Sequence, residues 1–579
     1  NFEYFSEDPC VAGAMGTAWV QGVQGSGAGT SLKHFVANNQ EYKRCNGNSQ
    51  VDERTLRELY LPAFEAVVKD AQPETVMCSY PRVNDVHSSD NTWLLTEVLR
   101  RDWGFEGLVV TDWGALCDRV KAMRAGCDLS MPGGSTYMED WVAEAVRNGS
   151  LREAEVDACA ARVLTLALRG KSRPKGKPFD QDAHDALAQK IAEQGAVLLK
   201  NEDAILPLAE KDIVLIGEMA RTMRYQGAGS SHINPTRLTT LCDALPDVPF
   251  IAGCDEKGTV TEASLAAAVS AAKTKTAVVC TGLPDIYESE GFDRETMAMP
   301  EGHCRLIDAV AAANPNTVVV LFCGCAVETP WLDKVKAVLY MGLPGQAGGR
   351  AAANLLLGRV APCGKLTETW PLCYGDVPSR DTFGKKVTRY KEGLYVGYRY
   401  YDKAGKAVRF PFGYGLSYTQ FTYTDLQIAG NTVTVTVTNT GKTAGAEIVQ
   451  LYIAPPQNGL YRPAKELKDF ARVSLKPGER KALTFTLHYR SFAVWNDGSW
   501  KVPAGHYGIL VGASSVDIRL HGTMEVKGAS PAVPEWQHGS WYETLQGLPS
   551  DAEFEALYGG PVQNGPPLRQ GLFTMENSV

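Results

Sequence analysis

Residues 1–168 alternate short apolar runs with amphipathic stretches. The apolar runs predict four β-strands, at 31–36, 75–80, 108–113 and 127–131. The stretches 53–69 and 93–103 between them have helical periodicity, with one apolar face in the first of the two. Alternation of strands and helices indicates a parallel sheet, which can be open or closed into a barrel.

Four strands are half of the eight that a (β/α)₈ barrel contains, and such a barrel typically takes ~250 residues. We therefore expect residues 1–168 to form a partial (β/α)₈-type barrel that lacks its first strands. An open barrel leaves strand edges and apolar surface exposed, which would favour a homo-oligomer.

A second α/β region follows a basic, Pro- and Gly-bearing linker, predicted at 169–185. A helix is predicted at 186–199. Strands predicted at 213–217, 277–282, 318–323 and 337–341 then alternate with Ala-rich helical stretches. Short, wholly apolar strands suit a sheet that is buried on both faces. We expect an α/β sandwich with a mainly parallel sheet over 186–405.

The pattern changes to period two from about residue 406. Val433, Val435 and Val437 alternate with Thr, as in a half-buried strand. Turn signals such as Pro477-Gly478 recur to about residue 526, which is typical of an all-β sandwich. Residues 527–579 are rich in Pro, Gly and aromatic residues, and we interpret them as an extended C-terminal extension that lies against another domain.

The composition is that of an ordinary globular protein, with 44% hydrophobic and 21% charged residues among 579. A net charge of −8 argues against nucleic acid and anionic membranes as partners. No apolar run is long enough for a transmembrane helix. The chain opens with Asn1 rather than Met, so we expect its natural beginning to be absent, and a signal peptide cannot be assessed.

The 14 cysteines have no short repeating spacing. They form no paired CxxC motifs and no Cys/His cluster at zinc spacing, so we expect no metal site. Reduced, mostly buried thiols imply a reducing compartment, which favours a cytoplasmic protein.

Three predicted strand ends carry candidate functional side chains. Asp112 follows an apolar strand and precedes Trp113. At the carboxyl end of a barrel strand, such a carboxylate can attack an anomeric carbon, and an indole can pack on a sugar ring. An Asp after a strand also fits a helix N-cap. Lys33 and His34 could bind sugar hydroxyls, or be a surface Lys beside a satisfied His. Met77 and Tyr80 could equally be core residues.

Two polar loops belong to the second region. The loop 287–294 contains Glu290 and could carry a mobile acid, although a solvated loop with a Glu–Arg pair is the simpler interpretation. The Gly-rich loop 227–232 matches neither a P-loop nor a dinucleotide fingerprint, so it gives little support to nucleotide binding.

These segments gain weight in combination. The chain carries, in order, the following motifs: residues 1–9 (NFEYFSEDP), 31–35 (SLKHF), 38–41 (NNQE), 77–80 (MCSY), 110–113 (VTDW), 197–201 (VLLKN), 290–294 (EGFDR) and 412–418 (FGYGLSY). This ordered set resembles the β-glucosidases of glycoside hydrolase family 3. The resemblance extends to about residue 526.

The resemblance implies roles for individual residues. Asp112 matches the family's nucleophile after the seventh barrel strand, and Glu290 matches the acid/base, which reaches the site from the second domain. Hydroxyl-binding residues are matched by Lys33, His34 and Arg44. The other expected substrate contacts are Met77, Tyr80, the platform Trp113 and, more weakly, Ser230. The C-terminal sandwich resembles a fibronectin type III-like domain.

The function that follows is release of terminal, non-reducing β-D-glucose with retention of configuration, without a cofactor. Retention needs one ionised and one protonated carboxyl group. We expect Lys33, Arg44 and a Tyr hydroxyl to keep Asp112 ionised, and burial to keep Glu290 protonated. A small carbohydrate or aryl glucoside is the expected substrate.

Two alternatives stay open. The first is a β-xylosidase of the same family, whereas an N-acetylglucosaminidase is disfavoured because those members tend to have a His-containing acid/base loop in the barrel. The second is a catalytically silent fragment that only binds carbohydrate or pairs with another polypeptide. The family places an Asp that grips distal hydroxyls, and a further Arg, in the segment we expect to be missing. We therefore expect weak activity, or none, from these 579 residues.

Overall fold

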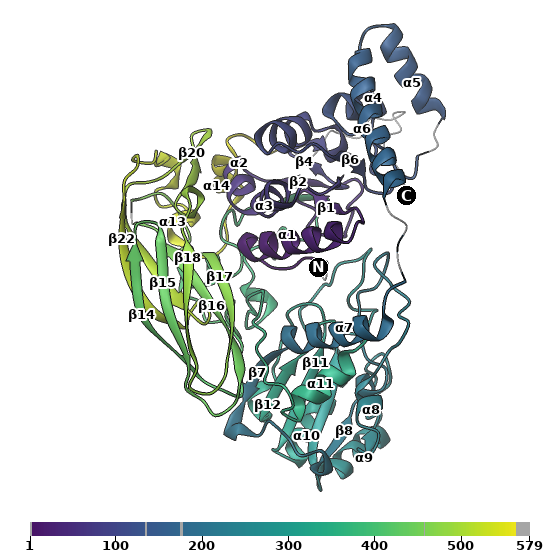
Figure 1. Cartoon of the computed structure of the whole chain (residues 1–579), viewed down its shortest axis with the longest axis vertical. Coiled ribbons are helices and arrows are strands. Elements are labelled where there is room, and N and C mark those ends of the chain that lie inside the picture. Colours follow the sequence, from purple (N-terminus) through teal and green to yellow (C-terminus); the bar gives the residue numbers. More distant parts are fainter. Residues whose placement is uncertain (1–2, 134–135, 174–175, 177, 457, 563–579) are drawn as a thin grey trace.

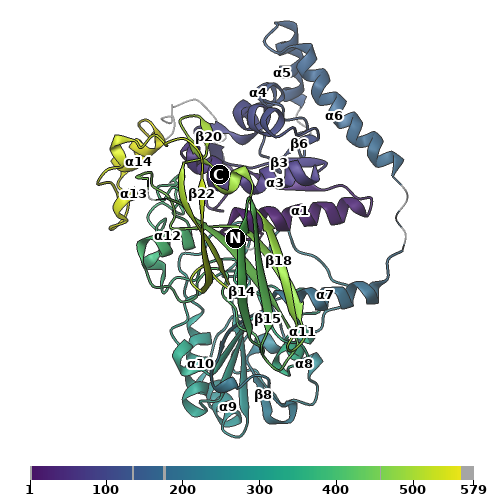
Figure 2. The same ribbon diagram turned by 60° about the vertical axis from the view of Figure 1, so that its left-hand side comes forward.

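The computed structural model describes residues 3–133, 136–173, 176, 178–456 and 458–562. Figure 1 shows three parts: a first α/β part in purple and blue at the top, a second in teal below it, and a β-sandwich in green along one side of both. Figure 2 shows α5 (Thr136–Arg147) and α6 (Glu153–Ser172) projecting away from the rest of the first part. Over the described ranges, no helix combines the length and apolarity needed to cross a membrane.

The first part is built on a parallel sheet of three strands. Their order is β1 (Ser31–Phe35), β3 (Thr75–Cys78) and β6 (Leu108–Thr111). The fourth predicted strand, 127–131, makes only an isolated parallel bridge, between Leu129 and Val110. Single backbone hydrogen bonds continue the contact, from the Thr111 N–H to the Leu129 carbonyl at 3.0 Å and from the Gly114 N–H to the Met131 carbonyl at 2.9 Å. The three strands of the sheet end on the side where His34 and Asp112 meet.

Helices cover this sheet. The helical run that begins at Glu53 differs in detail from the single helix predicted at 53–69. The run consists of α2 (Glu53–Thr55), the π-helical η1 (Leu56–Tyr60) and α3 (Pro62–Ala71). The Leu61 N–H reaches back to the Leu56 carbonyl, and Pro62, which lacks an N–H, opens α3. The remaining helices are α1 (Pro9–Gly25), the π-helical η3 (Trp93–Asp102), α4 (Arg119–Ala125), α5 and α6.

A small sheet joins distant parts of the sequence. Its order is β13 (Val387–Arg389), β2 (Asn48–Gln50), β4 (Arg82–Val83) and β5 (Val86–His87). The strand β13 pairs with β2 in parallel, so a segment near the end of the region predicted as the second α/β part returns to the first. This return ties the loop before β2, which contains the motif 38–41, to the rest of the molecule.

The second part has a six-stranded sheet. Its order is β7 (Val197–Asn201), β12 (Ala337–Tyr340), β11 (Thr317–Phe322), β10 (Thr276–Gly282), β8 (Ile213–Ile216) and β9 (Phe250–Ile251). All neighbours are parallel except β7 and β12. Here the predicted helix at 186–199 is wrong at its end: α7 (Gln181–Gly195) stops earlier and Val197 begins the edge strand. The apolar run 197–199 is buried, which suits a strand more than the last turn of a surface helix.

Successive strand residues of this sheet enter two cores. Ile213 and Leu215 pack with α7, α8 (Leu241–Ala244) and α11 (Gly348–Leu356). Val214 and Ile216 pack on the opposite face with α9 (Glu262–Ala272) and α10 (Glu301–Ala313). Burial on both faces explains why β8 is apolar throughout. The linker predicted at 169–185 begins within a helix, because α6 runs to Ser172.

The third part is a sandwich of two antiparallel sheets. One contains β14 (Phe421–Ala429), β15 (Thr432–Asn439) and β18 (Arg480–Thr486). The other contains β17 (Glu466–Leu475), β16 (Gly445–Ala454), β21 (Gly505–Gly512) and β22 (Ile518–Val526). Val433, Val435 and Val437 are fully buried between the sheets, as their period-two spacing predicts. A hairpin, β19 (Val494–Asn496) and β20 (Ser499–Lys501), lies beside them.

The C-terminal segment is not simply extended. It forms η10 (Glu535–Gln537), α13 (Trp541–Thr544) and α14 (Asp551–Tyr558). Trp541 and Tyr542 pack in an aromatic cluster with Tyr395 and Tyr400, near α12 (Tyr398–Ala404), and with Leu59 of the first part. The extension thus covers other parts of the protein, as expected, but does so with helices. Residues 563–579 of this predicted extension lie outside the described residues.

The N-terminal motif is a structural junction. The Asp8 carboxylate caps α1 through the Cys10 N–H at 2.8 Å, and it also accepts a hydrogen bond from the Tyr398 hydroxyl at 2.8 Å. Arg399 forms an ion pair with it at 2.8 Å and lies 3.6 Å from Glu466 of the sandwich. All of these charged groups are buried, so one ion network connects the first part, α12 and the sandwich.

Candidate active site

Asp112 lies directly beyond β6, where a fully buried strand ends. Its N–H donates to the Cys78 carbonyl of the neighbouring β3 at 3.2 Å, and its Oδ1 accepts the Trp113 N–H at 2.7 Å. Backbone contacts on both sides thus fix the position of the carboxylate at the end of the sheet. Its second oxygen, Oδ2, lies 3.3 Å from His34 Nε2 on β1.

The two basic residues of β1 point to different neighbours. The pKa of His34 is lowered, mainly by burial and further by Lys33, while the Asp112 carboxylate opposes this shift. A neutral imidazole can still donate one N–H to Asp112. Lys33 instead pairs with Glu3 at 3.2 Å, and 40% of its side chain is exposed. Of the predicted pair, only His34 contacts Asp112.

Tyr80 and Trp113 form one wall of the site. The Tyr80 hydroxyl donates to the Trp113 carbonyl at 2.9 Å, and burial together with the nearby Asp112 raises its pKa. The Arg44 guanidinium lies over the Tyr80 ring, 4.8 Å from its centroid. Trp113 is 54% exposed, so its indole is free to pack against a ligand. Met77 is half-buried on β3, one residue before its end.

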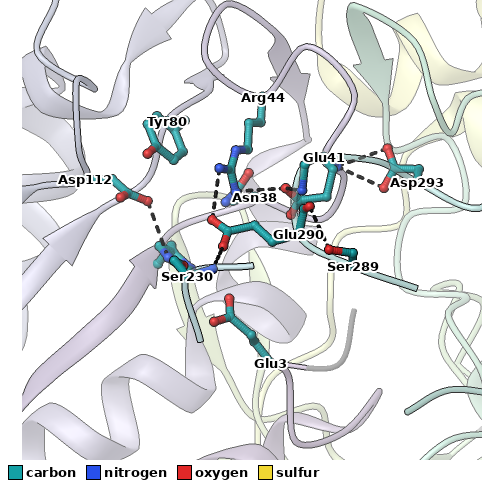
Figure 3. A network of polar contacts seen from close by, with 12 residues as sticks. Glu3, Asn38, Glu41, Arg44, Tyr80, Asp112, Ser230, Ser289, Glu290 and Asp293 are labelled. Carbon is teal, nitrogen blue, oxygen red and sulfur yellow. Dashed lines mark hydrogen bonds and ion pairs between the residues drawn. The ribbon is translucent and has the colours of Figure 1, made fainter. Parts of the chain in front are cut away.

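Glu290 comes from the loop after β10 in the second part. Figure 3 shows its carboxylate pointing toward that of Asp112, which belongs to the first part. Arg44 Nη2 lies 3.0 Å from Glu290 Oε1, and the Ser230 N–H donates to Oε2 at 2.5 Å. Ser230 therefore contacts Glu290 through its backbone. The Gly-rich loop thus supports Glu290.

The ionisation of Glu290 corrects the prediction from sequence. Burial alone would raise its pKa, but hydrogen bonds from Ser230 and Arg44 outweigh burial and lower the pKa to about 2. In this arrangement Glu290 is therefore an anion, whereas we expected it to keep its proton. The side chain is only partly buried, and two donors favour its charged form.

Two acidic residues that we had not assigned also belong to the site. Glu41 Oε2 lies 2.8 Å from Arg44 Nη1, so Arg44 bridges Glu41 and Glu290. Asp293 accepts backbone hydrogen bonds from the loop that holds Glu41. Glu41 lies within the motif NNQE and Asp293 within EGFDR. Membership of these motifs was the signal in the sequence that could have identified both residues. Within the described ranges, no group of three or more His, Cys, Asp or Glu side chains is placed to hold a metal ion.

Family models match most of the chain. The model of the glycosyl hydrolase family 3 N-terminal domain matches residues 1–166, and the model of the C-terminal domain of the same family matches residues 196–418. A fibronectin type III-like domain matches 447–515. The N-terminal match begins at residue 1, so the comparison does not confirm that the first part of the barrel is missing.

Among relatives, a thermostable β-glucosidase B of Acetivibrio thermocellus is 46% identical over 549 residues, which cover 91% of this chain and 73% of that protein. An exo-α-(1→6)-L-arabinopyranosidase of Bifidobacterium breve is 45% identical, with coverage of 93% and 75%.

Solved structures agree with this assignment. A family 3 β-glucosidase of Bifidobacterium adolescentis superimposes with a TM-score of 0.88 at 44% identity, covering 94% of this chain and 84% of that one. The β-glucosidase 3B of Thermotoga neapolitana in complex with glucose superimposes with a TM-score of 0.85 at 34% identity, covering 92% and 82%. The three-part architecture, the ordered motifs and these matches together show that the chain is a glycosidase and belongs to glycoside hydrolase family 3.

Proposed function

We propose that the protein releases terminal β-D-glucose from small β-glucosides by double displacement, with Asp112 as the nucleophile and Glu290 as the general acid/base. The observation that carries this proposal is the meeting of these two carboxylates, one from each α/β part, in one space (Figure 3). The names of several relatives, which are β-glucosidases, support the substrate.

In the first half of the reaction, Asp112 attacks the anomeric carbon and Glu290 protonates the departing oxygen, which leaves a covalent glycosyl-enzyme. In the second half, Glu290 removes a proton from water, which attacks the same carbon and releases the sugar. His34 donates to Asp112 and the backbone fixes its other oxygen, so the nucleophile is held in one orientation. Trp113 offers an exposed flat surface beside it.

The ionised Glu290 suits the second half, but the first half needs its proton. A substrate can change the contact between Arg44 and Glu290. Sugar hydroxyls that hydrogen-bond to the guanidinium compete with Glu290 for it, and Glu41 remains as the counter-ion of Arg44. Loss of the Arg44 contact removes one of the causes that lower the pKa of Glu290. A leaving group that excludes water would raise this pKa further.

A second candidate substrate is an α-L-arabinopyranoside, because two relatives at 45% and 44% identity carry that activity in their names. Its scissile bond is equatorial, as in a β-D-glucoside, but it lacks the C6 hydroxymethyl group and has an axial 4-hydroxyl. The same two carboxylates could therefore act on both sugars, and the contacts to the distal hydroxyls decide between them.

We also infer a small neutral glycoside as the partner, in keeping with the net charge of −8. A reducing, cytoplasmic setting is supported by the 14 cysteines, which are all free thiols.

The test compares hydrolysis of the 4-nitrophenyl β-D-glucoside, β-D-xyloside and α-L-arabinopyranoside, and follows the first-formed anomer by NMR. We expect the highest kcat/KM on the glucoside and β-glucose as the first product. Release of α-glucose would overturn the double displacement. A clear preference for the arabinopyranoside would replace the glucosidase by the second candidate, and a preference for the xyloside would replace it by a β-xylosidase. No turnover of any of the three would overturn both proposed activities and would agree with the weak or absent activity expected from the sequence.

A further inference from the structure

The loop that carries Glu290 is joined to the first part by a reciprocal set of backbone hydrogen bonds (Figure 3). Asp293, three residues after Glu290, accepts the Glu41 N–H at 2.9 and 3.0 Å and the Tyr42 N–H at 2.7 Å. In return, Glu41 Oε2 accepts the Gly291 N–H at 3.0 Å. Each loop therefore provides one carboxylate that binds the backbone of the other.

These contacts join segments that are far apart in the sequence. Residues 41 and 293 are separated by 252 positions, and nothing in local structure brings them together. Hydrogen bonds from N–H groups to a carboxylate are charge-assisted and stronger than those between neutral groups. Glu41 is also buried, where such bonds gain further from the low dielectric.

The same carboxylate is connected to the reacting group. Glu41 Oε2 accepts from both the Gly291 N–H and Arg44 Nη1, at 3.0 and 2.8 Å. The other nitrogen of Arg44, Nη2, lies 3.0 Å from Glu290 Oε1. A displacement of Glu41 would therefore change both the backbone beside Glu290 and the cation that Glu290 contacts.

Each loop is also anchored within its own surroundings. In the first loop, Gln40 Oε1 accepts a hydrogen bond from the hydroxyl of Thr388, in β13, at 2.7 Å. In the second, Arg294 donates to the Ala326 carbonyl at 3.1 Å and lies 2.9 Å from Cys325 Sγ. Each loop is thus held by its own contacts, and Glu41 and Asp293 connect the two loops.

We propose that Glu41 and Asp293 are positioning residues, forming a latch that holds the loop of Glu290 against the first part of the protein. The latch rests on the proposed role of Glu290. Because neither carboxylate reaches the reacting atoms through these contacts, its loss should impair proton transfer more than nucleophilic attack. A proton donor that is misplaced by about 1 Å can lose a hundredfold in rate.

The kinetic test uses Asp293→Ala and Asp293→Asn, with Glu295→Ala as the control, because Glu295 is an exposed carboxylate on the same loop. The substrates are 2,4-dinitrophenyl and methyl β-D-glucoside. The dinitrophenolate group can leave without being protonated, whereas the methoxy group needs a proton from a general acid. We expect Asp293→Ala to lose kcat/KM, which reports the first step, by roughly tenfold to a hundredfold more on the methyl glucoside than on the dinitrophenyl glucoside. Asp293→Asn, which keeps one acceptor oxygen, should recover part of this loss.

A second measurement does not depend on turnover. Hydrogen–deuterium exchange should become faster in Asp293→Ala at both 38–46 and 286–294, while Glu295→Ala exchanges like the wild type. Glu41→Gln serves as a further variant if Asp293→Ala does not fold, because it removes the ion pair with Arg44 and retains an acceptor for Gly291. It should show the same leaving-group dependence and faster exchange at 286–294.

The outcomes separate the latch from the proposed function. If folded latch variants lose kcat/KM equally on both substrates or not at all, or if exchange stays unchanged, the latch is wrong. Glu290→Ala distinguishes the two ideas. A leaving-group-dependent loss in Glu290→Ala, without one in the latch variants, overturns only the latch. Absence of that dependence in Glu290→Ala itself overturns the role of Glu290, while faster exchange in the latch variants would still show that the two loops are joined.

Discussion

Gly229 and Glu290 approach so closely that no side chain fits between them. A Cβ on Gly229 would lie 2.4 Å from the Cβ of Glu290 and 2.7 Å from its Oε2. Gly229 also has a φ of +98°, in the region that favours glycine. The Gly-rich loop can therefore bring the Ser230 N–H to the Glu290 carboxylate only because position 229 has no side chain.

We expect Gly229→Ala to displace Glu290 and to lower kcat for poor leaving groups by roughly tenfold or more. Gly27→Ala is the matched control. Gly27 has a similar φ of +91°, a Cβ there meets nothing within 4 Å, and it lies outside the loops that hold Glu290. It should show the backbone strain without the clash. Steady-state kinetics on methyl and dinitrophenyl glucosides measure both variants, and equal losses would mean that strain, not contact with Glu290, explains the effect.

Replacement of Asp112 tests the nucleophile. Asp112→Asn keeps the shape and the hydrogen bond from the Trp113 N–H, but a neutral amide forms no glycosyl-enzyme. We expect kcat to fall by roughly three orders of magnitude or more on every substrate. Asp118→Asn is the control, because Asp118 caps α4 through one oxygen that Asn retains. Activity near the wild-type level in Asp112→Asn would remove the assignment.

Replacement of Glu290 tests the acid/base. In Glu290→Ala we expect kcat/KM to fall by about 10²- to 10⁴-fold on substrates with poor leaving groups and by much less on 2,4-dinitrophenyl glucoside. Azide needs no general base, so it should accelerate the second step and yield a β-glycosyl azide. The exposed Glu295→Ala serves as the control on the same loop. A uniform loss with no response to azide would place the acid elsewhere.

A buried carboxyl group that the proposed mechanism does not use predicts a dependence of stability on pH. Glu392 is 6% exposed, and its Oε2 has no hydrogen-bond partner among the described residues. Burial raises its pKa to about 7, and Asp52 adds to the shift. The folded state therefore holds this proton more tightly than the unfolded chain. The resulting stabilisation is complete below the ordinary pKa near 4.5 and is lost as the pH rises to about 7.

Glu392→Gln should remove this dependence, since an amide does not titrate. Relative to that variant, we expect the wild type to lose about 3 kcal/mol of unfolding free energy between pH 4.5 and pH 7. Denaturant unfolding at both pH values measures the difference, and Glu256→Gln, at an exposed carboxylate, is the control. Wild type and Glu392→Gln with the same pH slope would show that Glu392 ionises normally.

The predicted architecture depended on patterns that local spacing makes visible. The alternation of Val and Thr around Val435 is read directly as a strand, because a sandwich buries one face of it. Strands such as β8 are apolar throughout, because their sheet is covered on both faces. The same rule failed at Val197, where a short apolar run at the end of a helix begins an edge strand. Periodicity alone does not separate the two over three residues.

The sequence by itself determined the three-part order of the fold and, through its motifs, the family and the candidates Asp112 and Glu290. The tertiary structure decided how these residues meet. It placed His34 but not Lys33 on Asp112, and bound Arg44 between Glu41 and Glu290 so that Glu290 is ionised. It also joined Asp293 to a loop 252 residues away. The pKa of a carboxyl group depends on which donors lie within a few ångströms, and those distances are set only when segments remote in sequence pack together.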